Sequence, residues 1–111
     1  MDYKYSFVFV EKARNDLDEI LNYISFVLNN TFASKELFDK IIYTINNICS
    51  FPKMYPLVTN DFLKSDNTRK AVVDNYIIFY NINSNEKTII ILRIIYAKRD
   101  INSILEELGI I

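Results

Sequence analysis

The chain has 111 residues and a mass of 13.1 kDa, half of its residues are hydrophobic, and only one is glycine and two are proline. That length predicts a single domain over residues 1–111, and the composition excludes a disordered or collagen-like chain because it can bury a core. The net charge of −1 argues against a protein built mainly to bind a phosphate backbone, which requires clustered Lys and Arg.

Two residue types limit the chemistry further. Histidine is absent, which excludes Ser–His and Cys–His hydrolases and His-ligated zinc enzymes. Cys49 is the only cysteine, so no intrachain disulfide or cysteine-rich zinc site can form, and we expect it to be a small buried hydrophobe. We expect no metal and no small-molecule cofactor. Apolar runs are too short to span a bilayer and the first residues do not resemble a signal peptide, so we expect a cytoplasmic protein without membrane contact.

The first half of the chain predicts a strand followed by two helices. Residues 3–10 alternate, with an aromatic face that could lie uncovered and consists of Tyr3, Tyr5, Phe7 and Phe9. From Glu11 the apolar period becomes helical. The first helical stripe consists of Ala13, Leu17, Ile20, Leu21, Ile24, Val27 and Leu28.

A second helix follows the Asn29-Asn30-Thr31 break, with Thr31 as its expected cap and Pro52 as its stop. Its apolar stripe consists of Phe32, Leu37, Phe38, Ile41, Ile42, Ile45, Ile48 and Cys49. Two long helices joined by so short a link should form an antiparallel hairpin.

The second half predicts a loop over residues 52–68, strands over 69–74, 76–82 and 87–97, and a short helix capped by Asp100 and stopped by Gly109. The continuous apolar runs of these strands are typical of a sheet that is covered on both faces. The element order is therefore β-α-α-β-β-β-α. We predict an α+β fold with a helical hairpin packed on a four-stranded, largely antiparallel sheet and a short C-terminal helix.

Four segments together resemble one family. They are EKARNDLDEILNYI (residues 11–24), ICSFP (48–52), RKAVVDNYIIFYNI (69–82) and IIILRIIYAKRDI (89–101). Their combination and spacing are similar to the RelE/ParE superfamily of bacterial type II toxins, and the likeness extends over most of the chain. It implies a small growth-arresting toxin, encoded beside a cognate antitoxin that binds and neutralises it. RelE-like members cut messenger RNA in the ribosome, whereas ParE-like members poison DNA gyrase.

Particular residues bear on the choice between these branches. RelE-like enzymes place an arginine early in the second strand of the β-hairpin, where this chain has Ile77, and commonly a histidine or tyrosine near the C-terminus, where it has Ile104 and Leu105. Lys70 and Arg99 match basic positions of some RelE-like enzymes and are the candidate catalytic residues if the chain is an endonuclease. The departures favour the ParE-like branch.

A local excess of cations marks the expected target-binding surface. Residues 53–100 hold eight Lys or Arg against five Asp or Glu, although the first 52 residues hold five against seven. The surface consists of Arg69, Lys70, Arg93, Lys98 and Arg99. Adjacent strand ends could bring several of them to one edge. The alternative is a solvated strand end, with Arg93 paired to a carboxylate such as Asp74 or Asp100.

Other polar and aromatic groups have simpler structural explanations. Asp100 is better explained as a helix cap than as a catalytic acid, and we expect Tyr76, Tyr80 and Tyr96 to pack rather than transfer protons. The acids of the first helix should be solvated partners of its dipole. These acids are Glu11, Asp16, Asp18 and Glu19.

Three functional hypotheses remain from the sequence. The first is a ParE-like inhibitor that binds DNA gyrase and has no active site, the second a RelE-like ribosome-dependent mRNA endonuclease, and the third a degenerate, non-toxic module that binds an antitoxin. In each case an antitoxin segment could cover the toxin by adding a strand to a sheet edge or by laying a helix in a groove.

Overall fold

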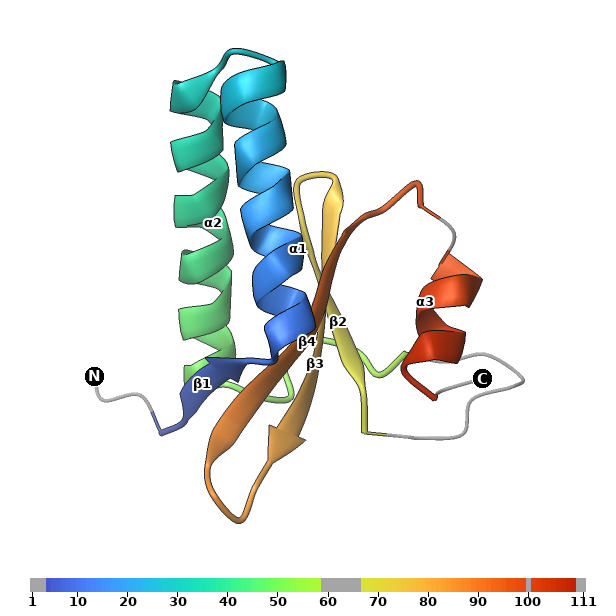
Figure 1. Cartoon of the computed structure of the whole chain (residues 1–111). Coiled ribbons are helices and arrows are strands. Elements are labelled where there is room, and N and C mark those ends of the chain that lie inside the picture. Colours follow the sequence, from blue (N-terminus) through green and yellow to red (C-terminus); the bar gives the residue numbers. More distant parts are fainter. Residues whose placement is uncertain (1–3, 59–66, 100, 110–111) are drawn as a thin grey trace.

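The computed structural model describes residues 4–58, 67–99 and 101–109. Its elements follow the predicted order and confirm the α+β class (Figure 1). They are β1 (Ser6–Phe9), α1 (Glu11–Asn22), a π-helical turn η1 (Tyr23–Val27), α2 (Thr31–Ser50), β2 (Arg69–Val73), β3 (Tyr76–Asn83), β4 (Thr88–Tyr96) and α3 (Ile101–Glu107). The expected cap Asp100 and residue Tyr3 lie outside the described residues. No helix in the described part of the chain is long and apolar enough to cross a membrane.

The sheet has the order β1-β4-β3-β2, with β1 parallel to β4 and the other pairs antiparallel. β1 is short and pairs with β4 only as far as Phe9 opposite Ile91, so the rest of β4 is an edge. There the register against β3 shifts, because Tyr80 faces Ile91 while Phe79 faces Arg93. Such a bulge redirects the side chains next to it.

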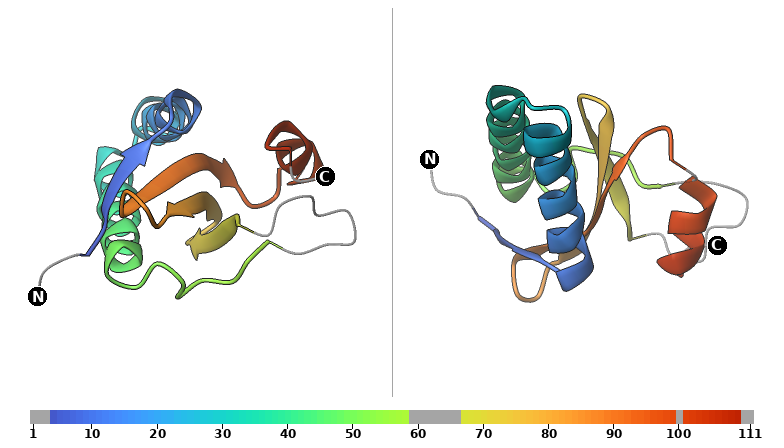
Figure 2. Two further views of the ribbon diagram at one scale, coloured as in Figure 1. Left: turned by 90° about the horizontal axis from the view of Figure 1, so that it is seen from below. Right: turned by 45° about the horizontal axis from the view of Figure 1, so that its top comes forward.

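Both faces of the sheet are covered, as the apolar strands predicted. The α1–α2 hairpin covers one face, called here the hairpin face, and α3 packs on the other, the α3 face (Figure 2). The hairpin-face cluster includes Ile41, Ile45 and Tyr80, and the α3-face cluster is built around Phe79 and Leu105. The seven-residue helix α3 therefore covers a second, separate hydrophobic cluster on the α3 face.

The prediction that the aromatic side of the first strand lies uncovered is wrong. Tyr5, Phe7 and Phe9 pack against the hairpin-face core, and the outward residues of β1 are Ser6 and Val8. Parallel pairing to β4 places the aromatic side of β1 under the hairpin, because alternate residues of a strand point to opposite faces.

The end of the first helix also departs from its predicted stripe. From Tyr23 the turn widens to π-helical, and the Leu28 N–H donates to the Tyr23 carbonyl at 3.0 Å. This shifts the apolar period, so Val27 and Leu28, predicted as core, are exposed. The N-cap of α2 is Asn30 rather than Thr31, since the Asn30 side chain accepts the N–H of Ala33 at 3.0 Å.

The second helix ends at Ser50, as Pro52 predicted, and buries Cys49, whose thiol pKa is raised by burial. Two members of its predicted stripe, Phe32 and Phe38, are exposed instead. Beyond the helix the Tyr80 hydroxyl donates to the Pro52 carbonyl at 2.8 Å and fixes the start of the loop to the core.

Candidate functional site

Arg93 is a buried cation whose charge is matched inside the fold. Its Nε donates to Oδ2 of Asp16 at 2.6 Å and its Nη2 to Oδ1 at 2.9 Å, which is bidentate geometry. The same Oδ2 accepts the N–H of Ile94 at 3.0 Å. Asp16 therefore satisfies an edge amide of β4 at the point where β1 has ended.

Glu107 of α3 and Lys12 of α1 extend this interaction. Arg93 Nη1 and Lys12 Nζ both donate to the carboxylate of Glu107. We call Lys12, Asp16, Arg93 and Glu107 the charged clasp, which joins α1, β4 and α3 with two cations and two carboxylates. The hydrogen bonds to Asp16 raise the pKa of Arg93, while the hydrogen bond from Lys12 and the charge of Arg93 lower the pKa of Glu107.

The clasp corrects two predictions. The carboxylates that pair with Arg93 are Asp16 and Glu107 rather than Asp74, which forms an ion pair with Lys40 at 3.3 Å. Asp16 is not a solvated dipole partner, since its side chain is only 11% exposed. The sequence did indicate that Arg93, a charged residue within an apolar strand, requires a carboxylate partner. Which carboxylates lie within its reach depends on the bulge in the sheet, and the sequence does not show that bulge.

The two cations at the start of β2 point to different faces. Arg69 faces Tyr80, is half-buried, and donates from Nη1 to the Tyr55 carbonyl at 2.7 Å. Lys70 faces Phe79 and is exposed, so it lies on the α3 face. Successive residues of a strand alternate in this way, so Arg69 and Lys70 do not form one basic surface.

Lys98 and Arg99 are exposed and follow β4 at the other end of the sheet. The amide of Ala97 donates to the Asn75 carbonyl at 2.8 Å, which places this exit beside the β2–β3 turn. Tyr80 and Tyr76 lie four residues apart on β3, which corresponds to roughly 13 Å along the strand. The strand register therefore separates the start of β2 from the end of β4, and the expected cluster is not continuous.

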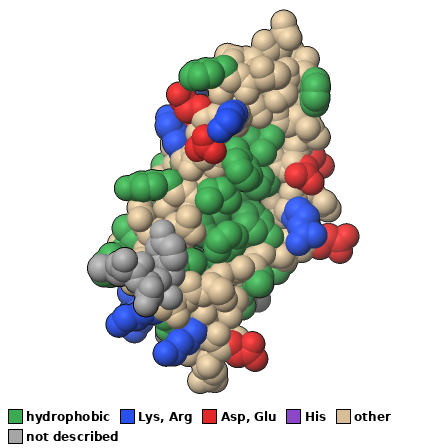
Figure 3. All heavy atoms as spheres, turned by 90° about the vertical axis from the view of Figure 1, so that its left-hand side faces the viewer, with side chains coloured by type: hydrophobic (Ala, Val, Ile, Leu, Met, Phe, Trp, Pro, Cys, Tyr) green, Lys and Arg blue, Asp and Glu red, His purple; other side chains and the backbone are tan. Residues whose placement is uncertain are grey.

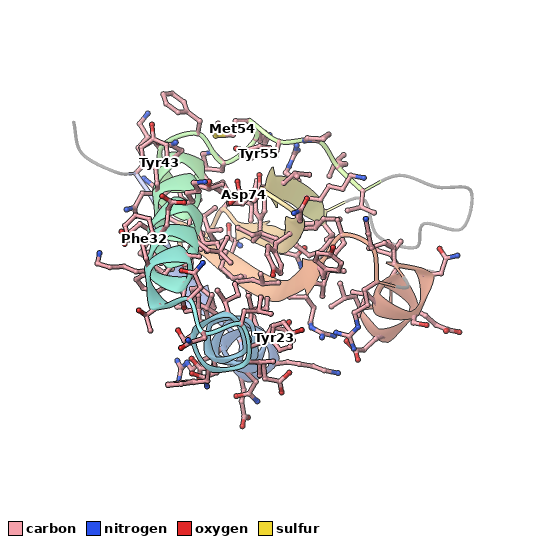
Figure 4. The ribbon with its side chains drawn as sticks, turned by 90° about the horizontal axis from the view of Figure 1, so that it is seen from above. Tyr23, Phe32, Tyr43, Met54, Tyr55 and Asp74 are labelled. Atoms are coloured by element: carbon pink, nitrogen blue, oxygen red, sulfur yellow. The ribbon has the colours of Figure 1, made fainter. Side chains whose placement is uncertain are left out.

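Exposed apolar side chains form a second candidate surface, a groove of about 480 Å³ between α2 and β2. Tyr43 and Val72 on its walls are strongly exposed, and the Lys40–Asp74 ion pair lies beside it. Figure 3 shows apolar side chains gathered on the face at the left of Figure 1, with charged side chains near their margins. Figure 4 shows Phe32 and Tyr43 along α2 and Asp74 between this helix and the sheet.

The free edge of β2 borders this groove. The Lys70 N–H points away from β3 and donates to the Pro56 carbonyl at 3.1 Å. The N–H of Val72, two residues on, points the same way, and it has no backbone partner among residues 4–58, 67–99 and 101–109. An unpaired edge beside an apolar groove can accept an extended peptide.

A third feature is an aromatic hollow of about 660 Å³ beneath the tip of the hairpin. Tyr76 and Tyr96 meet edge to face on neighbouring strands, with ring centroids 5.7 Å apart. Tyr23 of η1 completes the aromatic wall and lies between the end of α1 and the sheet (Figure 4). As predicted, Tyr76, Tyr80 and Tyr96 pack against other side chains of the sheet. Tyr23 was not predicted, because the π-helical turn that brings it to the hollow has no evident sequence signal.

Comparison with known proteins decides the family. The family model for the ParE toxin of type II toxin–antitoxin systems, parDE, matches residues 7–101. The chain belongs to the ParE toxin family. Its predicted place in the RelE/ParE superfamily is confirmed, and it is a type II toxin-antitoxin toxin of that superfamily. The match spans β1 through the start of α3 and so includes the clasp residues of α1 and β4. No curated protein sequence matches this ParE-family chain.

Solved structures show the same fold. The chromosomal ParDE system of P. aeruginosa superposes with a TM-score of 0.67 at 17% identity, over 87% of this chain and 100% of that one. The RelBE2 complex of Mycobacterium tuberculosis gives 0.56 at 18% identity, over 84% and 98% of the two chains. The RelE–RelB complex of Pyrococcus horikoshii gives 0.58 at 13% identity, over 87% and 99%.

Proposed function

We propose that this ParE-family toxin arrests growth by binding and poisoning DNA gyrase, without catalysis of its own, and that a cognate antitoxin neutralises it. The observation that carries the proposal is the ParE family match over residues 7–101. The placement of the cations supports it, because the residues that an endonuclease would require are dispersed.

Metal-independent RNA cleavage needs several groups around one phosphate. They activate the 2′-hydroxyl, stabilise the pentavalent phosphate and protonate the leaving oxygen. Lys70 lies on β2, whereas Arg99 lies beyond the far end of β4. In the described part of the chain neither side chain forms an ion pair or a hydrogen bond with a carboxylate or a tyrosine hydroxyl. Arg93 is fully engaged in the charged clasp, so it is not available to bind a phosphate without opening α3.

The proposed gyrase-binding surface is the β4 exit with Lys98 and Arg99, together with the exposed side of α3. The charged clasp supports this surface, because it holds α3 against the strand from which both cations emerge. In this arrangement Arg93 is a positioning residue and does not touch the target.

The antitoxin is proposed to cover the α2–β2 groove by pairing a strand with the open edge at Val72. The apolar side chains of Tyr43 and Val72, which now face water, would then be buried under the antitoxin. Solved relatives described as ParDE and RelBE systems support an antitoxin partner.

Pulse-labelling after induced expression in a bacterial host tests the target. DNA and protein synthesis are followed over the first minutes. We expect DNA synthesis to fall first while translation continues, and the purified toxin to inhibit supercoiling by gyrase. An early fall in translation contradicts the gyrase proposal and favours the endonuclease. If soluble toxin accumulates and both syntheses continue, the chain is a non-toxic antitoxin-binding module.

A further inference from the structure

The aromatic hollow has a composition that suits a cation. Three tyrosines from separate elements line it: Tyr23 from η1, Tyr76 from β3 and Tyr96 from β4. Ile20 and Leu28 complete the apolar wall, and the remaining lining residue is Glu19. No lysine or arginine is among these lining residues, so the hollow carries one negative charge and no positive one.

The carboxylate of Glu19 forms no ion pair within the described part of the chain, a property it shares with Glu11, Asp18 and Glu106. Asp16, Glu36, Asp39 and Glu107 each lie within ion-pair distance of a lysine or arginine. Glu19, on the same helix as Asp16, forms no ion pair with the described residues. It is exposed at the margin of the hollow and is available to a ligand.

The tyrosines supply the rest of a cation site. An aromatic ring attracts a cation to its face, and the attraction grows when rings and ligand are partly shielded from water. Burial raises the pKa of Tyr76, and the neighbouring Tyr96 and Tyr23 raise it further, so the phenol of Tyr76 keeps its proton near pH 7. Their hydroxyls donate to no group within the described ranges and can bind a polar ligand.

The surroundings indicate a protein as the source of the cation. Phe26 and Val27 lie on the same π-helical turn as Tyr23 and are among the most exposed apolar residues of the chain. Apolar surface of this kind beside a hollow is typical of a protein interface. A partner that covers the hairpin tip would bury these residues and direct one side chain into the hollow.

We propose that the hollow formed by Tyr23, Tyr76, Tyr96 and Glu19 binds the cationic side chain of an arginine or lysine of the antitoxin. The choice of antitoxin rests on the proposed function. Arginine fits better than lysine, because its planar guanidinium stacks on a ring while donating to a carboxylate.

The test uses the full chain with ¹³C-labelled tyrosine rings and acetyl-arginine-amide as the probe. The neutral isostere acetyl-citrulline-amide, at matched ionic strength, is its control. The arginine compound should shift the ring resonances of Tyr23, Tyr76 and Tyr96, while Tyr43, which lines the other groove, serves as the internal reference. Citrulline should shift them much less.

Two variants test the carboxylate and the aromatic wall. Glu19→Gln should weaken binding of the arginine compound about fivefold, whereas Asp18→Asn, its exposed neighbour outside the hollow, should not. Tyr23→Leu keeps an apolar side chain but removes one ring, and it should weaken binding more than Tyr43→Leu. Equal shifts with citrulline, no shift with either compound, or an unaffected Glu19→Gln variant each overturn the proposal.

The complex with the product of the adjoining antitoxin gene identifies the occupant. Once the complex has formed, acetyl-arginine-amide should no longer shift the three ring resonances. A hollow that still binds the probe in the complex overturns the assignment to the antitoxin. Growth arrest is not read out in these titrations, so their failure leaves gyrase poisoning untouched, and failure of gyrase inhibition leaves the cation site untouched.

Discussion

Arg93 and Asp16 form a bidentate ion pair across 77 positions of sequence, and both side chains are almost fully buried. The pair lies where β1 has turned into α1 and no longer hydrogen-bonds with β4. The carboxylate of Asp16 takes the place of the missing strand, because it also accepts the N–H of Ile94. One side chain thereby closes a sheet edge and neutralises a buried charge.

Replacing Asp16 with Asn should destabilise the fold by roughly 3 kcal/mol, because it leaves the buried guanidinium with one carboxylate instead of two. Urea denaturation measures the change in the free energy of unfolding. Asp18→Asn, an exposed change on the same helix, is the control and should alter stability by less than about 0.5 kcal/mol. Equal effects of the two substitutions would show that the pair does not stabilise the fold.

Acid should loosen α3 through Glu107. Lys12 and Arg93 hold the pKa of Glu107 below its ordinary value of 4.5, so the contribution to stability is complete above about pH 4.5 and is lost as the pH falls through the lower, folded-state value. The protection factor of the Leu108 amide, which donates to the Ile104 carbonyl at 3.0 Å, should therefore fall as the pH is lowered. Glu107→Gln should show low protection already at neutral pH, whereas Glu106→Gln should behave as the native chain. A protection factor that does not change with pH contradicts this role.

The sequence predicted the element order, the stop of α2 and the coverage of both sheet faces, because these depend on local periodicity and on proline. It failed where a single extra residue changes the period. The π-helical turn exposed Val27 and Leu28, and the bulge at Phe79 and Tyr80 directed Arg93 toward Asp16. Neither distortion has a strong local sequence signal.

The candidate target surface was only partly predictable for a related reason. The five cations belong to a local excess of charge in the sequence, but whether they group in space depends on strand register. Antiparallel pairing places Arg69 level with Tyr80, while the end of β4 is level with Tyr76. A count of charges along the chain carries no information on that register.

Alkaline pH should destabilise the protein through Tyr80. Burial raises the pKa of this phenol to about 12 from the ordinary value of 10.0. The folded state therefore retains the proton more strongly, so the contribution is present below pH 10 and is lost as the pH rises toward 12. The loss should amount to about 2 kcal/mol in denaturation experiments.

Tyr80→Phe isolates this contribution. It removes the hydroxyl that donates to the Pro52 carbonyl and should cost about 1 kcal/mol at neutral pH. It should also reduce the loss of stability between pH 10 and 12. Tyr43→Phe, at an exposed site, provides the matched control. An alkaline transition of native size in Tyr80→Phe would assign the effect to other groups.

Removing the charges of Lys98 and Arg99 should discriminate between the two mechanisms. If the β4 exit binds gyrase, Lys98→Ala combined with Arg99→Ala should reduce supercoiling inhibition by about thirtyfold, as expected for an interface hot spot. Lys70→Ala should have little effect, because Lys70 lies on the α3 face at the other end of the sheet.

An endonuclease that uses both Lys70 and Arg99 would instead lose several kcal/mol of transition-state stabilisation from either Lys70→Ala or Arg99→Ala. Lys35→Ala, which removes an exposed cation from α2, controls for net charge. The relative effect of Lys70 and Arg99 thus separates a surface that binds from a site that cleaves, because only cleavage requires both groups at one phosphate.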